Sequence, residues 1–276
     1  MSDVNHFFPA TIVLPTMPEV ATRLLKTFGD ENASLDELAG VIGKDQGLVG
    51  KVLRLANSAR YSPAHNISSL SDATAALGTV TLRNLALAAC IAGAFPVVAG
   101  MDRKKYWRHS LLCANYAVLL SRAVLLDSET SYLAGLMLRS GELLMAQTEP
   151  AAVTELESHV TEPGVRFDWE LNRFGCAHNH VTAELARRWQ FPQALVYGFG
   201  TASEPLAAKP FSLLGAVLHM AEVLADSVEL GVDPMQGLKT ACPDLLEHEH
   251  LDLVWIQQHL PNPADLAQEV ELMASS

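Results

Sequence analysis

The run Ala134-Gly-Leu-Met-Leu-Arg-Ser-Gly-Glu142 lies in a stretch from 128 to 147 whose pattern predicts a single helix that ends before Pro150. At its centre are Leu138 and Arg139. A leucine has no lone pair to offer a cation, and an arginine carries a fixed positive charge. At about 5 Å from a divalent ion, that charge would cost several kcal/mol even at an effective dielectric of ~20. We therefore expect no metal ligand from the centre of this helix.

Helical patterns continue on both sides of this run, and strand patterns are nearly absent, so the expected fold class is all-α. A capping box at Ser34-Leu-Asp-Glu37 starts one helix, and Gly78 is a typical residue after the end of another. The helices expected before the run cover 34–42, 45–56, 71–77, 79–95 and 105–124. Those expected after it cover 151–160, 169–174, 178–189, 213–228, 234–240, 252–259 and 264–273.

The composition excludes several classes of protein. The chain has 276 residues and is 49% hydrophobic, which suits one large helical domain or two lobes that share a seam. Its formal net charge of −12 argues against a nucleic-acid-binding surface, because phosphate contacts need clustered lysine and arginine. Neither a phosphate-binding glycine loop nor a Gly-x-Ser-x-Gly elbow is present, so neither motif indicates a cofactor or a serine nucleophile.

The sequence also predicts a cytoplasmic location without a membrane segment. The longest run without a charge, 84–101, contains Gly93 and Pro96, and we interpret it as a buried core helix. The N-terminus lacks the pattern of a secretory signal. The four cysteines, Cys90, Cys113, Cys176 and Cys242, form no Cys-x-x-Cys pair. Three of them lie in apolar or helical stretches, where we expect buried, reduced thiols.

A series of short fragments in the N-terminal part carries a family resemblance. The fragments are Leu14-Pro-Thr-Met-Pro-Glu-Val20, Ser34-Leu-Asp-Glu-Leu-Ala39, Val52-Leu-Arg-Leu-Ala-Asn-Ser-Ala59 with Tyr61, Ile67-Ser-Ser69, Ala75-Ala-Leu-Gly78 and Leu82-Arg-Asn-Leu85. In this order and spacing they resemble the HDOD family, the HD-related output domain. The resemblance covers roughly residues 12–230. It implies an N-terminal helical lobe over 12–100 and an HD-like helical lobe over 101–231, followed by a C-terminal helical extension over 232–276.

The second lobe resembles the HD superfamily of metal-dependent phosphohydrolases more loosely. Trp107-Arg-His-Ser110 resembles the first HD-type histidine, and Phe174-Gly-Cys-Ala-His178 resembles a later one. Glu222 stands where HD enzymes carry the aspartate that is their last metal ligand. The run 134–142 is similar to Ala-Gly-Leu-Leu-His-Asp-Ile-Gly-Lys, whose His-Asp pair holds the catalytic metal in those enzymes.

The resemblance therefore implies that Leu138 and Arg139 replace two lost ligands and that the remaining positions are vestigial. His109, His178 and Glu222 could still converge as two histidines and a carboxylate. We favour packed, hydrogen-bonded histidines with no metal and no cofactor. Four residues then define a candidate ligand cavity: His109, Arg139, His178 and Glu222.

Arg139 could instead form an ion pair with Glu222 or with Glu142. Glu142 is also the acid nearest to the aspartate that the HD resemblance implies was lost. On a continuous helix it lies about 60° back around the axis and a turn further along, so we do not expect it to replace that aspartate beside a nucleophilic water.

Two other acidic and histidine-rich stretches are weaker candidates for metal binding. His180 and Glu184 share a helical face, and Glu247-His-Glu-His250 is a short acidic run. We interpret both as exposed contacts. In the first lobe, Asn57 either ties the helix end to its neighbours or occupies a left-handed turn, and a partner-binding role is the alternative.

The resemblance implies a non-catalytic bacterial signalling or regulatory output module that binds a protein partner or a small ligand. One alternative is a metal-dependent phosphohydrolase with a reduced ligand set, acting on a nucleotide or a cyclic dinucleotide. Another is a sensor that holds a nucleotide without cleaving it, since Arg139 and His109 would suit a phosphate. A homo-oligomer is compatible with the apolar helix 213–228, and we expect neither nucleic acid nor a membrane as partner.

Overall fold

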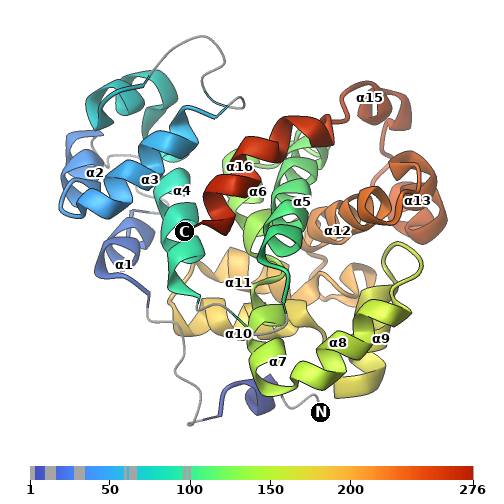
Figure 1. Cartoon of the computed structure of the whole chain (residues 1–276). Helices are drawn as coiled ribbons and strands as arrows, with labels where there is room; N and C mark the ends of the chain where they lie inside the picture. The colour runs from blue at the N-terminus through green and yellow to red at the C-terminus, as the bar shows by residue number, and fades with distance from the viewer. Residues whose placement is uncertain are drawn as a thin grey trace. The chain divides into compact units, whose positions relative to one another are not determined.

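The computed structural model describes residues 4–9, 17–27, 35–58, 61, 67–95, 98 and 101–275. Over these residues the chain forms α-helices and short 3₁₀ segments and no strand, which confirms the all-α fold class (Figure 1). The chain divides into two compact units. One unit contains Pro15–Pro96 with Ala264–Ser276, and the other contains Met1–Leu14 with Val97–Pro263. The C-terminal stretch 232–276 is thus shared between the two units.

The smaller unit is built around a long helix. It contains α1 (Glu19–Leu25), α2 (Leu35–Ile42), α3 (Gln46–Ala56), α4 (Leu70–Ala94) and α16 (Ala267–Ala274). Helices α2, α3 and α16 contact α4, and α16 also contacts α3. Gly78 breaks α4 with a φ of 76°, at the boundary that the sequence predicted. The predicted capping serine, Ser34, lies outside the described residues.

The second half of α4 is buried continuously from Leu82 to Ala92, as expected of a core helix. Among the described helices, α4 alone is long and apolar enough to cross a membrane by length and composition, and most of that segment is buried. The core helices of globular proteins often meet the same two criteria.

Asn57 closes the C-terminal end of α3. Its Nδ2 donates to the carbonyl oxygens of Leu53 at 2.8 Å and Ile67 at 2.7 Å, and its Oδ1 accepts from the Ile67 N–H at 2.8 Å. The φ of Asn57 is −90°, so the left-handed turn considered from the sequence is wrong. The side chain itself bridges the two segments, which confirms the predicted tie between the helix end and its neighbours.

The larger unit carries eleven α-helices within the described residues. They are α5 (Arg103–Ala123), α6 (Ser128–Met137), α7 (Ser140–Thr148), α8 (Pro150–His159), α9 (Val165–Phe174), α10 (His178–Arg188), α11 (Gln193–Thr201), α12 (Leu213–Leu230), α13 (Pro234–Ala241), α14 (Pro243–His248) and α15 (Leu253–Gln258). Helix α5 packs against α6 and α12, and α10 packs against α7 and α11. The sequence did not predict α11, and α9 starts earlier than expected.

The helix predicted over 128–147 is two helices, because α6 ends at Met137 and α7 begins at Ser140. Thr182 on α10 holds the break. Its hydroxyl donates to the Leu138 carbonyl at 2.7 Å and accepts from the Gly141 N–H at 2.8 Å. A Cβ on Gly141 would lie 2.2 Å from the backbone oxygen of His178, so only glycine lets α7 approach α10 this closely. The helix axis changes at this break, between Arg139 and the residues of α7.

The four cysteines are buried and none forms a disulfide, which confirms the expectation for the three in apolar or helical stretches. Burial raises the pKa of both Cys90 and Cys242 to about 12. Such thiols stay protonated at neutral pH and behave as apolar core groups.

Candidate functional site

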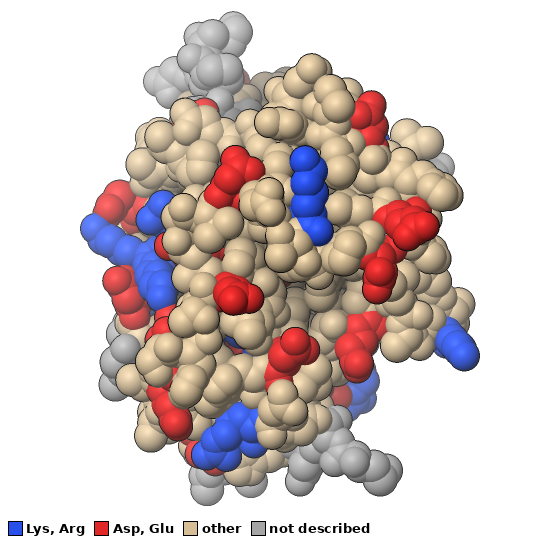
Figure 2. Space-filling model, turned by 90° about the vertical axis from the view of Figure 1, so that its right-hand side faces the viewer, with Lys and Arg blue, Asp and Glu red and all other residues tan. Residues whose placement is uncertain are grey.

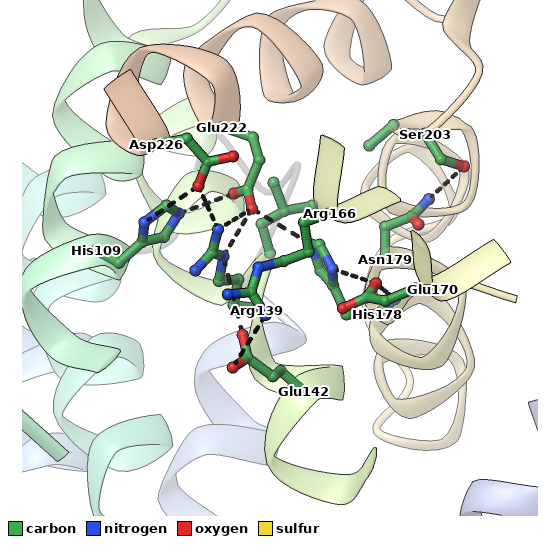
Figure 3. Close-up of polar contacts among 12 residues, drawn as sticks. His109, Arg139, Glu142, Arg166, Glu170, His178, Asn179, Ser203, Glu222 and Asp226 are labelled. Atoms are coloured by element: carbon green, nitrogen blue, oxygen red, sulfur yellow. Dashed lines mark hydrogen bonds and ion pairs between the residues drawn. The ribbon is translucent and has the colours of Figure 1, made fainter. Parts of the chain in front are cut away.

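The four residues predicted for the cavity come together in the interior of the larger unit (Figure 3). His109 comes from α5, Arg139 from the junction of α6 and α7, His178 from the first position of α10, and Glu222 from α12. The carboxylate of Glu222 is at their centre. Its Oε2 lies 3.1 Å from His109 Nε2, and its Oε1 accepts from Arg139 Nε at 2.6 Å and lies 3.8 Å from His178 Nε2. All four side chains are buried.

Arg139 has a second carboxylate partner that the sequence analysis missed. Its Nη2 donates to Asp226 Oδ1 at 2.7 Å, and Asp226 Oδ2 accepts from the Gly164 N–H at 3.0 Å. The signal was present in the sequence, because Asp226 follows Glu222 by one turn in a predicted amphipathic helix. The predicted pairing of Arg139 with Glu222 is confirmed, and the guanidinium spans two acids rather than one.

His109 meets a third acid of the same helix. Its Nδ1 lies 3.2 Å from Glu229 Oε2, so the imidazole sits between two carboxylates. Burial and the Arg139 charge lower the pKa of His109, but Glu222 and Glu229 outweigh both and raise that pKa from 6.5 to about 9. Burial alone would raise the pKa of Glu222, yet the charges of Arg139 and His109 hold it well below its usual value. His109, Glu222 and Arg139 are therefore all charged at neutral pH.

Glu142, the other acid considered as a partner of Arg139, also approaches it. Its Oε2 lies 3.9 Å from Arg139 Nε, and its Oε1 lies 3.5 Å from Arg166 Nη1. Arg139 precedes α7 as its N-cap residue, and Glu142 lies in the first turn of that helix. Arg166 was not predicted as part of the site. It also donates from Nη2 to Glu157 Oε1 at 2.6 Å.

His178 is a packed, hydrogen-bonded histidine. Its backbone N–H donates to Glu170 Oε2 at 2.7 Å, and its ring Nδ1 lies 2.7 Å from the same oxygen. The imidazole stacks on Phe167 with ring centroids 4.9 Å apart and an interplanar angle of 17°. Glu170 was not predicted, although it lies in a helix expected from the sequence. These contacts fix the ring in a structural role.

Three of the buried groups have ligand atoms close enough to share a metal ion. One atom each of His109, Glu222 and Asp226 lies within 4.8 Å of the others. However, Arg139 donates to both carboxylates, and its guanidinium is the cation that these acids surround. Leu138, fully buried beside it, offers no ligand atom. The residues present therefore do not fit a divalent metal of the HD type.

The weaker metal candidates do not assemble either. Glu184 accepts hydrogen bonds from Arg187 and Arg188 at 2.7 Å, while His180 Nδ1 accepts from the Ala177 N–H at 3.1 Å. His248 Nδ1 lies 2.7 Å from Glu249 Oε1 on the surface. No group that includes these side chains qualifies as a metal site among the described residues.

A cavity of about 300 Å³ lies beside the charged cluster. His109 and Arg139 line it, as the sequence analysis proposed for a ligand cavity, whereas His178 and Glu222 do not. Its other charged lining residues are Asp102, Lys105, Glu142, Glu157 and Glu229. The cavity therefore opens on the side of the cluster that faces α7 and α8.

The comparison with known families decides the classification. The family model described as "HDOD domain" matches residues 14–205, which is more than half of the chain. This chain belongs to the HDOD family. Membership confirms the predicted family and the coarser part of the functional prediction, a signalling-related HD-like module.

Solved structures show the same fold. A protein from Shewanella amazonensis SB2B named "Putative phosphohydrolase" is 25% identical with a TM-score of 0.78, over 99% of this chain and 98% of that one. An HDOD domain protein with unknown function from Geobacter sulfurreducens is 24% identical with a TM-score of 0.75, over 99% and 95% of the two chains. A Marinobacter aquaeolei VT8 protein named "Putative signal transduction protein" is 23% identical with a TM-score of 0.76, over 95% of this HDOD chain and 59% of that one.

One curated relative is an uncharacterized protein of Treponema pallidum (strain Nichols). It is 25% identical over 193 residues, which are 66% of the HDOD chain and 36% of the relative. The chain thus spans about a third of that relative's length.

Proposed function

We propose that this chain is a non-catalytic regulatory module of the HDOD family that acts in the cytoplasm by binding a protein partner or a small ligand. The observation that carries the proposal is the position of the Arg139 guanidinium. It donates to Glu222 at 2.6 Å and to Asp226 at 2.7 Å, at the point where the HD resemblance places the catalytic metal. An internal cation takes the place of the ion.

A divalent ion could join these carboxylates only at a large electrostatic cost. A divalent ion at about 4 Å from the guanidinium carries two positive charges. Their repulsion from Arg139 would cost on the order of several kcal/mol at an effective dielectric of ~20. If Arg139 moved away instead, Glu222 and Asp226 would lose their cation without gaining contact with water, because both side chains are almost completely buried. Without a metal-bound water, an HD-type site has no nucleophile for hydrolysis.

The alternative is a phosphohydrolase with a reduced ligand set. It is favoured by the closeness of His109, Glu222 and Asp226 and by the printed name of the Shewanella protein. It requires Arg139 to leave both carboxylates in the working state. The regulatory proposal needs no such rearrangement, and the printed name of the Marinobacter protein agrees with it.

The partner in this proposal is a protein or a small molecule rather than a nucleic acid. The net charge of −12 supports this choice. On the face drawn in Figure 2, the lysine and arginine side chains lie in separate small groups among acidic ones and form no continuous basic patch. A phosphate backbone would find no row of cations on that face.

The test is the metal content of the purified protein, compared with that of the double variant Leu138→His with Arg139→Asp. The wild type should contain no stoichiometric divalent metal, and added Mn²⁺ should leave its melting temperature unchanged. The double variant adds one carboxylate to those of Glu222 and Asp226 and one imidazole to those of His109 and His178, so Mn²⁺ should bind it and raise its melting temperature.

Leu138→His alone serves as the control, because it adds an imidazole but keeps Arg139. It should remain metal-free. Stoichiometric metal in the wild type, together with hydrolysis of a nucleotide or cyclic dinucleotide that Glu222→Gln abolishes, would establish the phosphohydrolase alternative and overturn the proposal.

A further inference from the structure

The cavity beside the charged cluster has one polar side and one apolar side. Helices α5, α7, α8 and α12 contribute its lining. Ala146, Pro150 and Val153 form an aliphatic wall, and the remainder is mostly charged, with Met101, Tyr106 and Thr154 among the charged residues. A volume of about 300 Å³ lies at the lower end of the range for small-molecule sites. The cavity suits a compact ligand with one polar end and one apolar end.

The cations that line this cavity are already engaged with carboxylates. Arg139 uses Nε and Nη2 for Glu222 and Asp226, at 2.6 and 2.7 Å. Lys105 forms a close ion pair with Glu157 at the edge of the cavity. An anionic ligand such as a phosphate would have to break these pairs to obtain its own donors.

Two carboxylate oxygens of the cavity lining have no hydrogen-bond donor. Glu142 Oε2 and Glu229 Oε1 are buried and accept no hydrogen bond from any described residue. The Glu142 side chain is only 8% exposed and that of Glu229 only 12%. A buried acceptor without a donor is destabilising, and more so when it is charged. Both residues line the cavity, so a donor placed there would satisfy them.

The balance of charges in the cluster also favours a hydrogen-bond donor in the cavity. Its carboxylates outnumber its cations even when both histidines are counted as positive. Apart from the exposed pair of Lys105 and Glu157, which cancel, the five acids are Glu142, Glu170, Glu222, Asp226 and Glu229, and the four bases are His109, Arg139, Arg166 and His178. A buried cluster with an uncompensated negative charge favours a cationic ligand.

We propose that this cavity binds a small aliphatic amine in its protonated form. The ammonium group donates to Glu142 and Glu229, and the alkyl chain lies against Ala146, Pro150 and Val153. This ligand class replaces the nucleotide phosphate considered from the sequence, because the donors that a phosphate needs are taken. The inference names the ligand of the regulatory module and in that respect rests on the proposed function.

The experiment is calorimetric titration of the full chain at neutral pH with butylamine and with putrescine. Butanol, which has the same alkyl chain without the charge, and inorganic phosphate are the matched probes. Both amines should bind and raise the melting temperature, while butanol and phosphate should do neither. Binding of phosphate with no binding of either amine would overturn the proposal.

Two variants locate the site by different physical changes. Glu142→Gln removes the charged acceptor and should weaken amine binding about tenfold or more. Ala146→Met fills the cavity without changing a charge and should abolish binding. Glu247→Gln, an exposed residue away from the cavity, is the control and should bind like the wild type. Amine affinities that neither cavity variant changes would place the binding elsewhere and contradict the proposal.

The outcome is separable from that of the proposed function. A protein that lacks metal and hydrolytic activity but binds no amine would retain the regulatory proposal and exclude this ligand class. A wild type that carries a divalent metal and hydrolyses a nucleotide or cyclic dinucleotide would exclude the regulatory proposal whatever the amine titration shows.

Discussion

Arg139 Nε lies 2.6 Å from Glu222 Oε1, although 83 residues separate the two in the chain. The same guanidinium reaches Asp226, one turn further along α12. A planar fork of donors suits two neighbouring carboxylates better than the point charge of a lysine would. The ion pair joins the break between α6 and α7 to α12, at the place where the HD resemblance puts a metal. An ionic cross-link within the chain thus holds together helices that HD relatives connect through a metal ion.

Removing this cation should destabilise the larger unit strongly. Arg139→Met leaves Glu222 and Asp226 buried without their partner, and we expect a loss of about 3–5 kcal/mol in the free energy of unfolding. The matched control is Arg187→Met, because Arg187 also pairs with an acid but its side chain is 62% exposed. That variant should lose far less stability, because an ion pair exposed to solvent contributes little. Urea titrations of both variants provide the comparison, and equal losses would contradict the role assigned to Arg139.

The raised pKa of His109 predicts a dependence of stability on pH. The folded protein holds the proton up to about pH 9, whereas the unfolded chain releases it near 6.5. The stabilisation from charged His109 is therefore complete below about pH 6.5 and is lost as the pH rises towards 9. Its full size is on the order of 3 kcal/mol. Urea unfolding across this range should show a fall that is shallower in His109→Gln than in the wild type.

His248→Gln is the control for this pH effect, because His248 is an exposed histidine outside the cluster. Its pH profile should follow that of the wild type. If His109→Gln retains the full wild-type slope, another group is responsible for the dependence.

A methyl group on Gly141 should disrupt the contact between α7 and α10. Its Cβ would lie 2.2 Å from the His178 oxygen and 2.7 Å from the Thr182 nitrogen, and both are backbone atoms that cannot simply rotate away. We expect Gly141→Ala to lose about 3 kcal/mol or more. Gly200→Ala in α11 is the control, since its Cβ would meet only Ala183 at an ordinary 3.7 Å. That control should change stability by less than about 1 kcal/mol, and thermal unfolding of the pair measures the difference.

The amide of Asn57 should contribute measurably to the smaller unit. Asn57→Ala removes three hydrogen bonds, one to Leu53 within α3 and two that join the end of α3 to Ile67. We expect a loss of about 1–3 kcal/mol and faster hydrogen exchange at the Ile67 amide, whose acceptor disappears. Asn57→Asp keeps that acceptor and should protect the Ile67 amide better than alanine does. Gln46→Ala, an exposed change on the same helix, should alter neither quantity.

The sequence predicted most helices, because apolar periodicity, caps and glycine breaks act over a few residues. It predicted the helix boundary at Gly78, because that is a local backbone preference. It also predicted which residues come together with Glu222, because that follows from the family resemblance. It missed the interruption at Leu138 and Arg139, which a hydroxyl from another helix maintains. Helical geometry over 128–147 therefore could not give the position of Glu142, since the angle between two residues follows that geometry only while the helix continues.

By itself, the sequence determined the all-α class, the family, and the absence of ligand atoms at positions 138 and 139, because each of these follows from residue types and their local spacing. Only the tertiary structure decided that Arg139 donates to both Glu222 and Asp226 and that His109 lies between two acids. It also decided that two carboxylate oxygens of the cavity lining accept no hydrogen bond. Those pairings join helices far apart in the chain. They depend on how the apolar faces of α5, α7 and α12 pack, which no short window of sequence contains.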